Sequence, residues 1–185
     1  MWSTAAERAV QESGLAVTAR GVLERLFDRL LEENGGALSR LAASYTNSAA
    51  DRDDLTQEIA LAIWRALPHF RGECSERTFT FRIAHNRAVT YLTQRCAQRA
   101  EVVDAVNVAD ASPGPEAGLV REQQGARLRL AIRSLPLLYR QVVTLVLEEM
   151  EYEEISQVLG ISESNVGARL SRARQMLREL MEVSR

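Results

Sequence analysis

Apolar residues recur along most of the chain at the three- and four-residue spacing of an amphipathic helix. Near the N-terminus, for example, Val22, Leu26 and Leu30 fall on one side of such a helix. No segment shows the sustained apolar and polar alternation, or the β-branched runs between turns, that indicate a sheet. The pattern therefore predicts an all-α protein made of two small helical domains joined by a flexible linker.

The first domain is expected to cover residues 19–99 and to contain four helices. Gly35 and Gly36 end the first of these helices, because glycine is the common stop residue. Asp51 is an acceptable N-cap for the third helix, and Pro68 ends that helix. The four helices are predicted at residues 19–33, 37–45, 51–67 and 78–98.

The helical pattern dissolves between residues 100 and 118, where prolines and glycines interrupt a run of small residues. This stretch is the predicted linker, and residues 119–185 form the second domain. Ser134 is a candidate cap, and Pro136 suits the first turn of the helix that follows. Residues 1–18 precede the first domain as an extension, a disordered tail or a regulatory contact. The helices of the second domain are predicted at residues 119–134, 137–149, 152–159 and 163–181.

From Tyr152 onward, a short helix, a tight turn with Gly160 and a longer helix follow one another. This order is the helix-turn-helix pattern, whose longer helix enters the major groove of DNA. Arg172 is long enough to reach a guanine edge, whereas Arg169 and Arg174 suit phosphates. A solvated basic face is the simpler alternative. The candidate DNA contacts on this helix are Ser164, Asn165, Ala168, Arg169, Ser171, Arg172 and Arg174.

Composition narrows the function classes without identifying one. A net charge of −2 disfavours a protein that coats DNA by itself, although charge is segregated between an acidic stretch at 148–154 and an arginine-rich one at 169–178. No run has the length of a membrane span and the N-terminus lacks a signal peptide, so the protein is expected in the cytoplasm. Cys74 and Cys96 are not clustered, which predicts reduced thiols and neither a metal site nor a cofactor.

The third helix has two distinct faces. Leu55, Ile59 and Ile63 form an inward stripe at helical spacing. The other face is polar with a leucine at its centre, which is typical of a protein interface; a merely solvated face is the alternative. The candidate partner-binding residues on this face are Asp54, Gln57, Glu58, Leu61 and Arg65.

Short motifs in both domains occur in the order found in one known family. In the first domain they are DRDDLTQE at 51–58, IWRAL at 63–67, FRGE at 70–73 and TFTFRIAHN at 78–86. In the second domain they are LP at 135–136, YEEI at 152–155, LGIS at 159–162 and VGARLSRAR at 166–174. Together these motifs resemble the extracytoplasmic-function sigma factors of the sigma-70 family.

The resemblance implies an alternative sigma factor, which binds core RNA polymerase, directs it to promoters, helps open the DNA and catalyses no reaction of its own. It implies that the polar face with Asp54, Gln57 and Glu58 contacts the clamp helices of the largest polymerase subunit, with the beta flap as a further polymerase surface. It also implies that the first domain engages the minus-ten element, that the second domain reads the minus-thirty-five element, and that an anti-sigma factor is a possible partner.

The loop from Pro68 to Arg77 resembles the promoter-melting loop of that family. The stretch from Phe70 to Phe79 has an aromatic residue at each end, and an unpaired base is held in protein pockets by stacking and edge hydrogen bonds. Three residues depart from the family pattern: Phe79 replaces the usual tryptophan, Glu76 replaces an aromatic or other bulky residue, and Gly167 replaces a basic residue. The candidate minus-ten contacts are Phe70, Arg71, Phe79, Arg82 and Asn86.

Other interpretations stay open at this point. A dimeric helix-turn-helix repressor or activator shares the second domain but leaves the motifs of residues 51–86 unexplained. An enzyme using Cys74 with His69 or His85 lacks any nucleophile or phosphate-binding motif. Cys74 could instead sense oxidants, given the arginines near it in the loop. A flexible linker would also permit a closed form that covers both DNA-binding faces.

Overall fold

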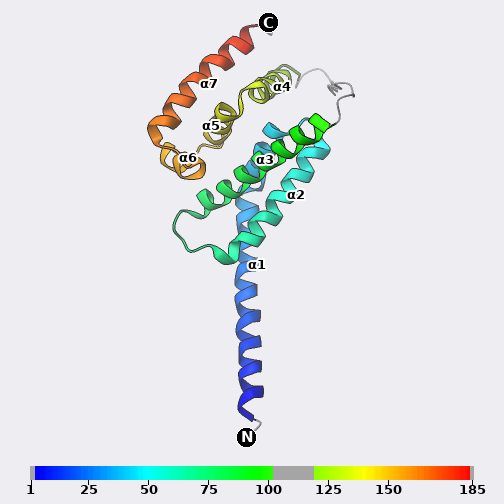
Figure 1. Ribbon diagram of the computed structural model, residues 1–185, viewed down its shortest axis with the longest axis vertical. Coiled ribbons are helices and arrows are strands. Elements are labelled where there is room, and N and C mark those ends of the chain that lie inside the picture. Colours follow the sequence, from blue (N-terminus) through cyan, green and yellow to red (C-terminus); the bar gives the residue numbers. More distant parts are fainter. Residues whose placement is uncertain (1–2, 102–118, 184–185) are drawn as a thin grey trace.

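The computed structural model describes the backbone of residues 3–101 and 119–183, and the side chains of residues 20–95 and 125–182. All regular structure in these ranges is helical, which confirms the predicted fold class (Figure 1). Most of the expected linker, residues 102–118, lies outside the described residues. The helices are α1 (Ser3–Tyr45), α2 (Ala49–Ala66), the short 3-10 helix η1 (Leu67–His69), α3 (Glu76–Glu101), α4 (Leu119–Ser134), α5 (Leu137–Leu147), α6 (Tyr152–Leu159) and α7 (Glu163–Val183).

The first domain consists of α1, α2 and α3, and α1 is its longest element (Figure 1). The predicted stop at Gly35 and Gly36 is wrong, because α1 continues through both glycines to Tyr45. Leu30 before the glycine pair and Leu38 after it are both fully buried. Burial of leucines on both sides of the glycine pair therefore outweighs the helix-breaking tendency of the two glycines, which cost about 1 kcal/mol each.

The ends of α2 and α3 are fixed by short polar side chains. The Ser48 hydroxyl accepts a hydrogen bond from the Asp51 backbone amide at 3.1 Å, so Ser48 rather than Asp51 is the N-cap of α2. The Ser75 hydroxyl likewise accepts from the Thr78 amide at 3.0 Å and starts α3. The predicted inward stripe of α2 is confirmed, since Leu55, Ile59 and Ile63 are fully buried.

The second domain consists of α4 to α7 and contains the expected helix-turn-helix. Gly160 takes the left-handed conformation, with φ of 65°, between α6 and α7. Ser134 does not cap α5 as predicted. Its hydroxyl donates to the Leu130 carbonyl within α4 at 3.0 Å, and Pro136 precedes the first turn of α5. The α5 helix ends at Leu147 rather than at residue 149.

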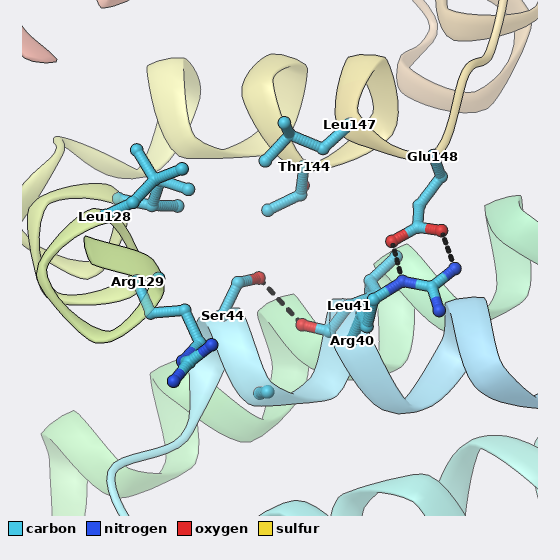
Figure 2. Close-up of a pocket in the computed structure, with 11 residues that line it drawn as sticks. Arg40, Leu41, Ser44, Leu128, Arg129, Thr144, Leu147 and Glu148 are labelled. Carbon is cyan, nitrogen blue, oxygen red and sulfur yellow. Dashed lines mark hydrogen bonds and ion pairs between the residues drawn. The ribbon is translucent and has the colours of Figure 1, made fainter. Parts of the chain in front are cut away.

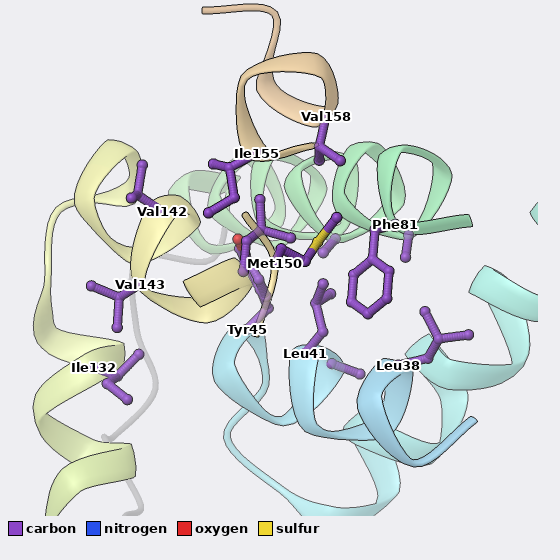
Figure 3. Packing of buried hydrophobic residues seen from close by; sticks show 14 of the residues in the cluster. Leu38, Leu41, Tyr45, Phe81, Ile132, Val142, Val143, Met150, Ile155 and Val158 are labelled. Carbon is purple, nitrogen blue, oxygen red and sulfur yellow. The ribbon is translucent and has the colours of Figure 1, made fainter. Parts of the chain in front are cut away.

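The two domains pack against each other around a common apolar core. Helix α6 lies on α3, while α4 and α5 contact α1. Figure 3 shows Ile155 and Val158 of α6 above Phe81 of α3, with Met150 between them and Leu41 of α1. Burial of these side chains supplies the main stabilisation of this arrangement.

Candidate nucleic-acid and protein interfaces

The outer face of α2 carries the five residues that the sequence singled out for partner binding. Asp54, Gln57, Leu61 and Arg65 are exposed. Leu61 has 54% of its surface accessible, so it is an exposed apolar side chain within this polar face. Glu58 differs from the others, because its carboxylate accepts two hydrogen bonds from Arg87 of α3, at 3.0 and 2.8 Å. Glu58 therefore also joins α2 to α3.

A hollow between α1 and α2 adjoins this face, and sequence reasoning missed it. The rings of Phe27 and Trp64 meet edge to face at its floor, with 5.2 Å between centroids. Gln57 and Leu61 form the α2 side of the hollow. The sequence feature that could have revealed this hollow is Trp64, a large aromatic residue that follows the buried Ile63 in a helix whose other residues are mostly small or polar. The residues lining the hollow are Glu24, Phe27, Asp28, Gln57, Ala60, Leu61 and Trp64.

The predicted minus-ten residues gather around a second, more polar hollow where the loop meets α3. The rings of Phe70 and Phe79 lie 4.6 Å apart at a tilt of 40°, so the two ends of the loop are held together. Arg71, Arg82 and Asn86 reach the same hollow. His69, Glu73, Cys74 and Ile83 complete its lining. The volume of about 480 Å³ is in the range that accommodates a small ligand or a single base.

The loop that forms this hollow is anchored from both sides. Arg82 donates to the half-buried Cys74 thiol, with 2.8 Å between Nη2 and Sγ. Glu76, the residue that departs from the family pattern, accepts from Arg29 of α1 at 3.0 Å. Gly72 turns the loop with a φ of 73°, a conformation that favours glycine. The polar substitution at position 76 is thus accommodated by an ion pair instead of aromatic packing.

His85 belongs to the same motif but lies in the core. Its side chain is buried, and burial lowers its pKa to about 4, so the ring is neutral at pH 7. The ring packs edge-on to Tyr45, with 6.4 Å between centroids. No cluster of His, Cys, Asp or Glu that could hold a metal ion occurs among the described residues. His85 is therefore a packing residue of the first domain.

Helix α7, the predicted recognition helix, exposes most of its candidate DNA contacts. Val166, Leu170 and Ala173 are buried on its inner face. Arg169 is half-buried and donates to the Asn165 side-chain oxygen at 3.1 Å, which holds both side chains on the helix surface. The residues exposed to solvent are Ser164, Asn165, Ala168, Ser171, Arg172 and Arg174.

The residues of each predicted site thus lie close to one another. The three sites are separate: one is on α2, one is at the start of α3 and one is on α7. The domains are packed together, yet Asn86 of α3 and Arg172 of α7 both remain exposed. The packed arrangement therefore leaves these two candidate DNA contacts uncovered. The two domains pack against each other through the buried apolar residues of α3 and α6.

Two regions of one protein family match the chain. Residues 30–97 match Sigma-70 region 2, and residues 125–177 match Sigma-70, region 4. The RNA polymerase sigma factor CnrH of Cupriavidus metallidurans is 30% identical over 177 residues, which cover 91% of this chain and 93% of CnrH. The ECF RNA polymerase sigma factor SigE of Mycolicibacterium smegmatis is 30% identical over 84% of this chain, which spans only 61% of that longer protein.

Solved structures agree with the sequence matches. CnrH in complex with the cytosolic domain of CnrY superposes with a TM-score of 0.64 at 27% identity, covering 88% of this chain and 91% of CnrH. The sigma factor RpoE of Bartonella quintana, in complex with the anti-sigma factor NepR, superposes with a TM-score of 0.66 at 21% identity, over 86% of this chain and 98% of RpoE, and shares the fold.

The chain belongs to the sigma-70 family, with region 2 in its first domain and region 4 in its second. Sigma-70 proteins are transcription regulators that act inside the cell with RNA polymerase. Within the family it is an alternative RNA polymerase sigma factor of the extracytoplasmic-function group. The repressor alternative is not favoured, since region 2 accounts for the motifs of residues 51–86. Among the described helices, none combines the length and the apolar character needed to cross a bilayer.

Proposed function

We propose that the exposed face of α2 and the adjoining hollow dock this sigma factor on the clamp helices of core polymerase. The observation that supports this most directly is the exposure of Leu61 beside Phe27 and Trp64, an apolar centre within a charged rim. Protein interfaces commonly combine such an apolar centre with a polar rim. Asp54 and Arg65 supply charges of opposite sign at this rim.

The hollow at the start of α3 is proposed to hold one base of the opened minus-ten element. The aromatic rings of Phe70 and Phe79 offer stacking surfaces, while Arg71 and Arg82 can donate hydrogen bonds to the base or to a phosphate. Asn86, exposed one turn further along α3, is in reach of the neighbouring nucleotide. Because Arg82 already donates to Cys74, the arginine enters this hollow in a defined orientation.

Helix α7 is proposed to read the minus-thirty-five element in the major groove. Arg172 is exposed on the outer face and is suited to a bidentate contact with guanine. Ser164, Asn165, Ala168 and Ser171 would contact neighbouring base edges. Arg169 and Arg174 are assigned to phosphates, which position the helix without specifying sequence.

No step of this function requires chemistry by the protein, so the chain is proposed to catalyse no reaction. It is proposed to work in the cytoplasm, because the RNA polymerase that it directs carries out transcription there. An anti-sigma factor is a further proposed partner, since RpoE is bound to one in its solved structure. The beta flap of the polymerase is proposed as the surface that holds the second domain.

Run-off transcription tests this function directly. Purified core polymerase is combined with fragmented high-GC bacterial DNA, with and without the full chain, and transcript starts are mapped. We expect discrete starts preceded by two shared sequence elements, only in the presence of the chain. Sequence-specific binding to DNA without core polymerase, together with no new starts, would instead support the repressor.

A further inference from the structure

Gly167 of α7 has no side chain, and an aromatic ring of α6 lies against it. A Cβ atom on Gly167 would be 3.7 Å from Cε2 of Tyr152, which is ordinary van der Waals contact. Cε2 is bonded to Cζ, the atom that carries the hydroxyl, so the hydroxyl end of Tyr152 lies beside α7. Gly167 is one helical turn from Ser164 and one from Ser171, two of the candidate base contacts. The Tyr152 ring therefore borders the surface of α7 that is assigned to DNA.

Tyr152 keeps a polar group at this border. The residue is 41% exposed, although one edge of its ring packs on α7. Within residues 20–95 and 125–182, no group forms a hydrogen bond with the Tyr152 hydroxyl. A tyrosine hydroxyl can donate one hydrogen bond and can also accept. The side chain is thus held in place by its ring while its hydrogen-bonding capacity stays unused.

The acidic stretch at 148–154 limits which groups can approach DNA at this point. Glu148 is held by Arg40 of α1, whose guanidinium donates to the carboxylate at 3.0 and 2.6 Å (Figure 2). Glu154 accepts a backbone amide at 3.1 Å and so closes the start of α6. The exposed carboxylates of the stretch repel phosphates, which carry the same charge. Tyr152 is the one side chain of the stretch that can donate a hydrogen bond.

The position of Tyr152 in the helix-turn-helix indicates which part of the DNA it meets. In this motif the second helix enters the major groove, while the first helix crosses the sugar-phosphate backbone. The first helix is α6, and Tyr152 is its first residue. Tyrosine hydroxyls are among the groups that donate to phosphate oxygens in protein–DNA complexes. A phosphate is therefore the acceptor that fits Tyr152, whereas Ser164 and Ser171 of α7 face base edges.

We propose that Tyr152 is a phosphate contact beside the minus-thirty-five element, and that Gly167 positions it by leaving room for its ring on α7. This inference rests on the proposed function, because it requires α7 in the major groove. A phosphate contact fixes how the helix-turn-helix sits on the duplex and carries no sequence information of its own. The hydroxyl is uncharged, so the contact displaces no counterion from the DNA.

Removal of one oxygen atom tests the contact. Tyr152→Phe keeps the ring but lacks the hydroxyl, and the promoter affinity of holoenzyme should fall about tenfold, measured by fluorescence anisotropy on promoters mapped with the wild-type chain. The loss should be equal on all base variants of the minus-thirty-five element, with an unchanged salt dependence. Arg174→Ala should instead reduce the salt slope by about one. Tyr139→Phe is the matched control, because it removes the same atom from a half-buried tyrosine that packs against the core.

Single methylphosphonate substitutions in the promoter locate the contacted phosphate. At one phosphate beside the minus-thirty-five element, the substitution should cost the wild-type holoenzyme about tenfold and cost the Tyr152→Phe holoenzyme little, because that contact is already absent. Equal losses for the two proteins at every phosphate, or wild-type affinity for Tyr152→Phe, would overturn the assignment. A loss confined to particular base variants would also overturn it, since Tyr152 would then contact a base.

Substitutions at Gly167 test the positioning role. Gly167→Ala should keep the wild-type affinity, because a Cβ makes only ordinary contact with the ring. Gly167→Leu should displace the ring and weaken binding about as much as Tyr152→Phe, and the two losses should not add in the double variant. Additive losses would contradict positioning by Gly167. Circular dichroism checks that every variant keeps its helix content. Absence of promoter-specific binding by the wild-type holoenzyme would count against the proposed function instead.

Discussion

Truncation of Leu61 offers the sharpest test of the polymerase-docking face. Complete burial of a leucine side chain contributes about 1.5–3 kcal/mol. Leu61 is 54% exposed in the free chain, so docking can bury about half of it and gain roughly 1 kcal/mol. Leu61→Ala should therefore weaken core binding by about five- to tenfold. Leu61→Asp should weaken it further, because docking would then remove a charge from water.

The choice of Leu61 avoids a complication at Glu58. Alanine at Gln57 and Glu58 together would also break the ion pair with Arg87. Such a pair, with both side chains partly exposed, contributes at most about 1 kcal/mol to folding. A loss of polymerase binding in that double variant would therefore mix an interface effect with a folding effect.

Fluorescence titration of labelled chain with core polymerase measures the binding change for Leu61→Ala. Val22→Ala is the control, since Val22 is 51% exposed in the same domain but does not line the hollow. Thermal unfolding should shift by only a few degrees in either variant, about 2–4 °C per kcal/mol for a chain of this size. Unchanged affinity for Leu61→Ala, or equal weakening by both substitutions, would refute the docking assignment.

Three further predictions concern the other domain surfaces and the core. Arg172→Ala should cost about 1–3 kcal/mol at the contacted base in competition binding of holoenzyme to promoter variants; equal weakening on all DNA would make Arg172 a phosphate contact. His85 has a pKa of about 4 in the folded chain and an ordinary value near 6.5 when unfolded, so the unfolded chain binds more protons between these values. The free energy of unfolding should thus fall by roughly 3 kcal/mol as the pH drops from 6.5 to 4. Urea unfolding measures this fall, and the His85→Gln variant, which lacks the titrating group, is the reference. Gly35→Ala should raise stability by about 0.5–1 kcal/mol, because a Cβ there meets no atom within 4 Å; a lower melting temperature would contradict this.

The helix faces were predictable because their periodicity reports burial directly. Leu55, Ile59 and Ile63 of α2 are buried where the pattern placed them, and the candidate base contact Arg172 of α7 is exposed. The helix-turn-helix was equally accessible, since Gly160 marks a left-handed turn that few other residues adopt. These features depend on neighbours within a few residues along the chain.

Helix boundaries were less predictable where local preference and tertiary packing disagree. Gly35 and Gly36 indicate a stop, but Leu30 before them and Leu38 after them are both buried. The gain from burying both leucines exceeds the local cost of the glycines. The N-cap of α2 was misplaced for a smaller reason, since Ser48 and Asp51 are both acceptable caps and only the hydrogen bond decides between them.

The sequence by itself determined the helical class, the faces of α2 and α7, and the family to which the chain belongs. Only the tertiary structure decided that Glu58 pairs with Arg87, that Phe27 joins Leu61 in one hollow, and that Glu148 links the two domains. Glu58 and Arg87 are 29 residues apart, and Arg40 and Glu148 are 108 residues apart. Helical periodicity describes one element at a time, whereas these contacts exist only because the apolar faces of different helices share one core.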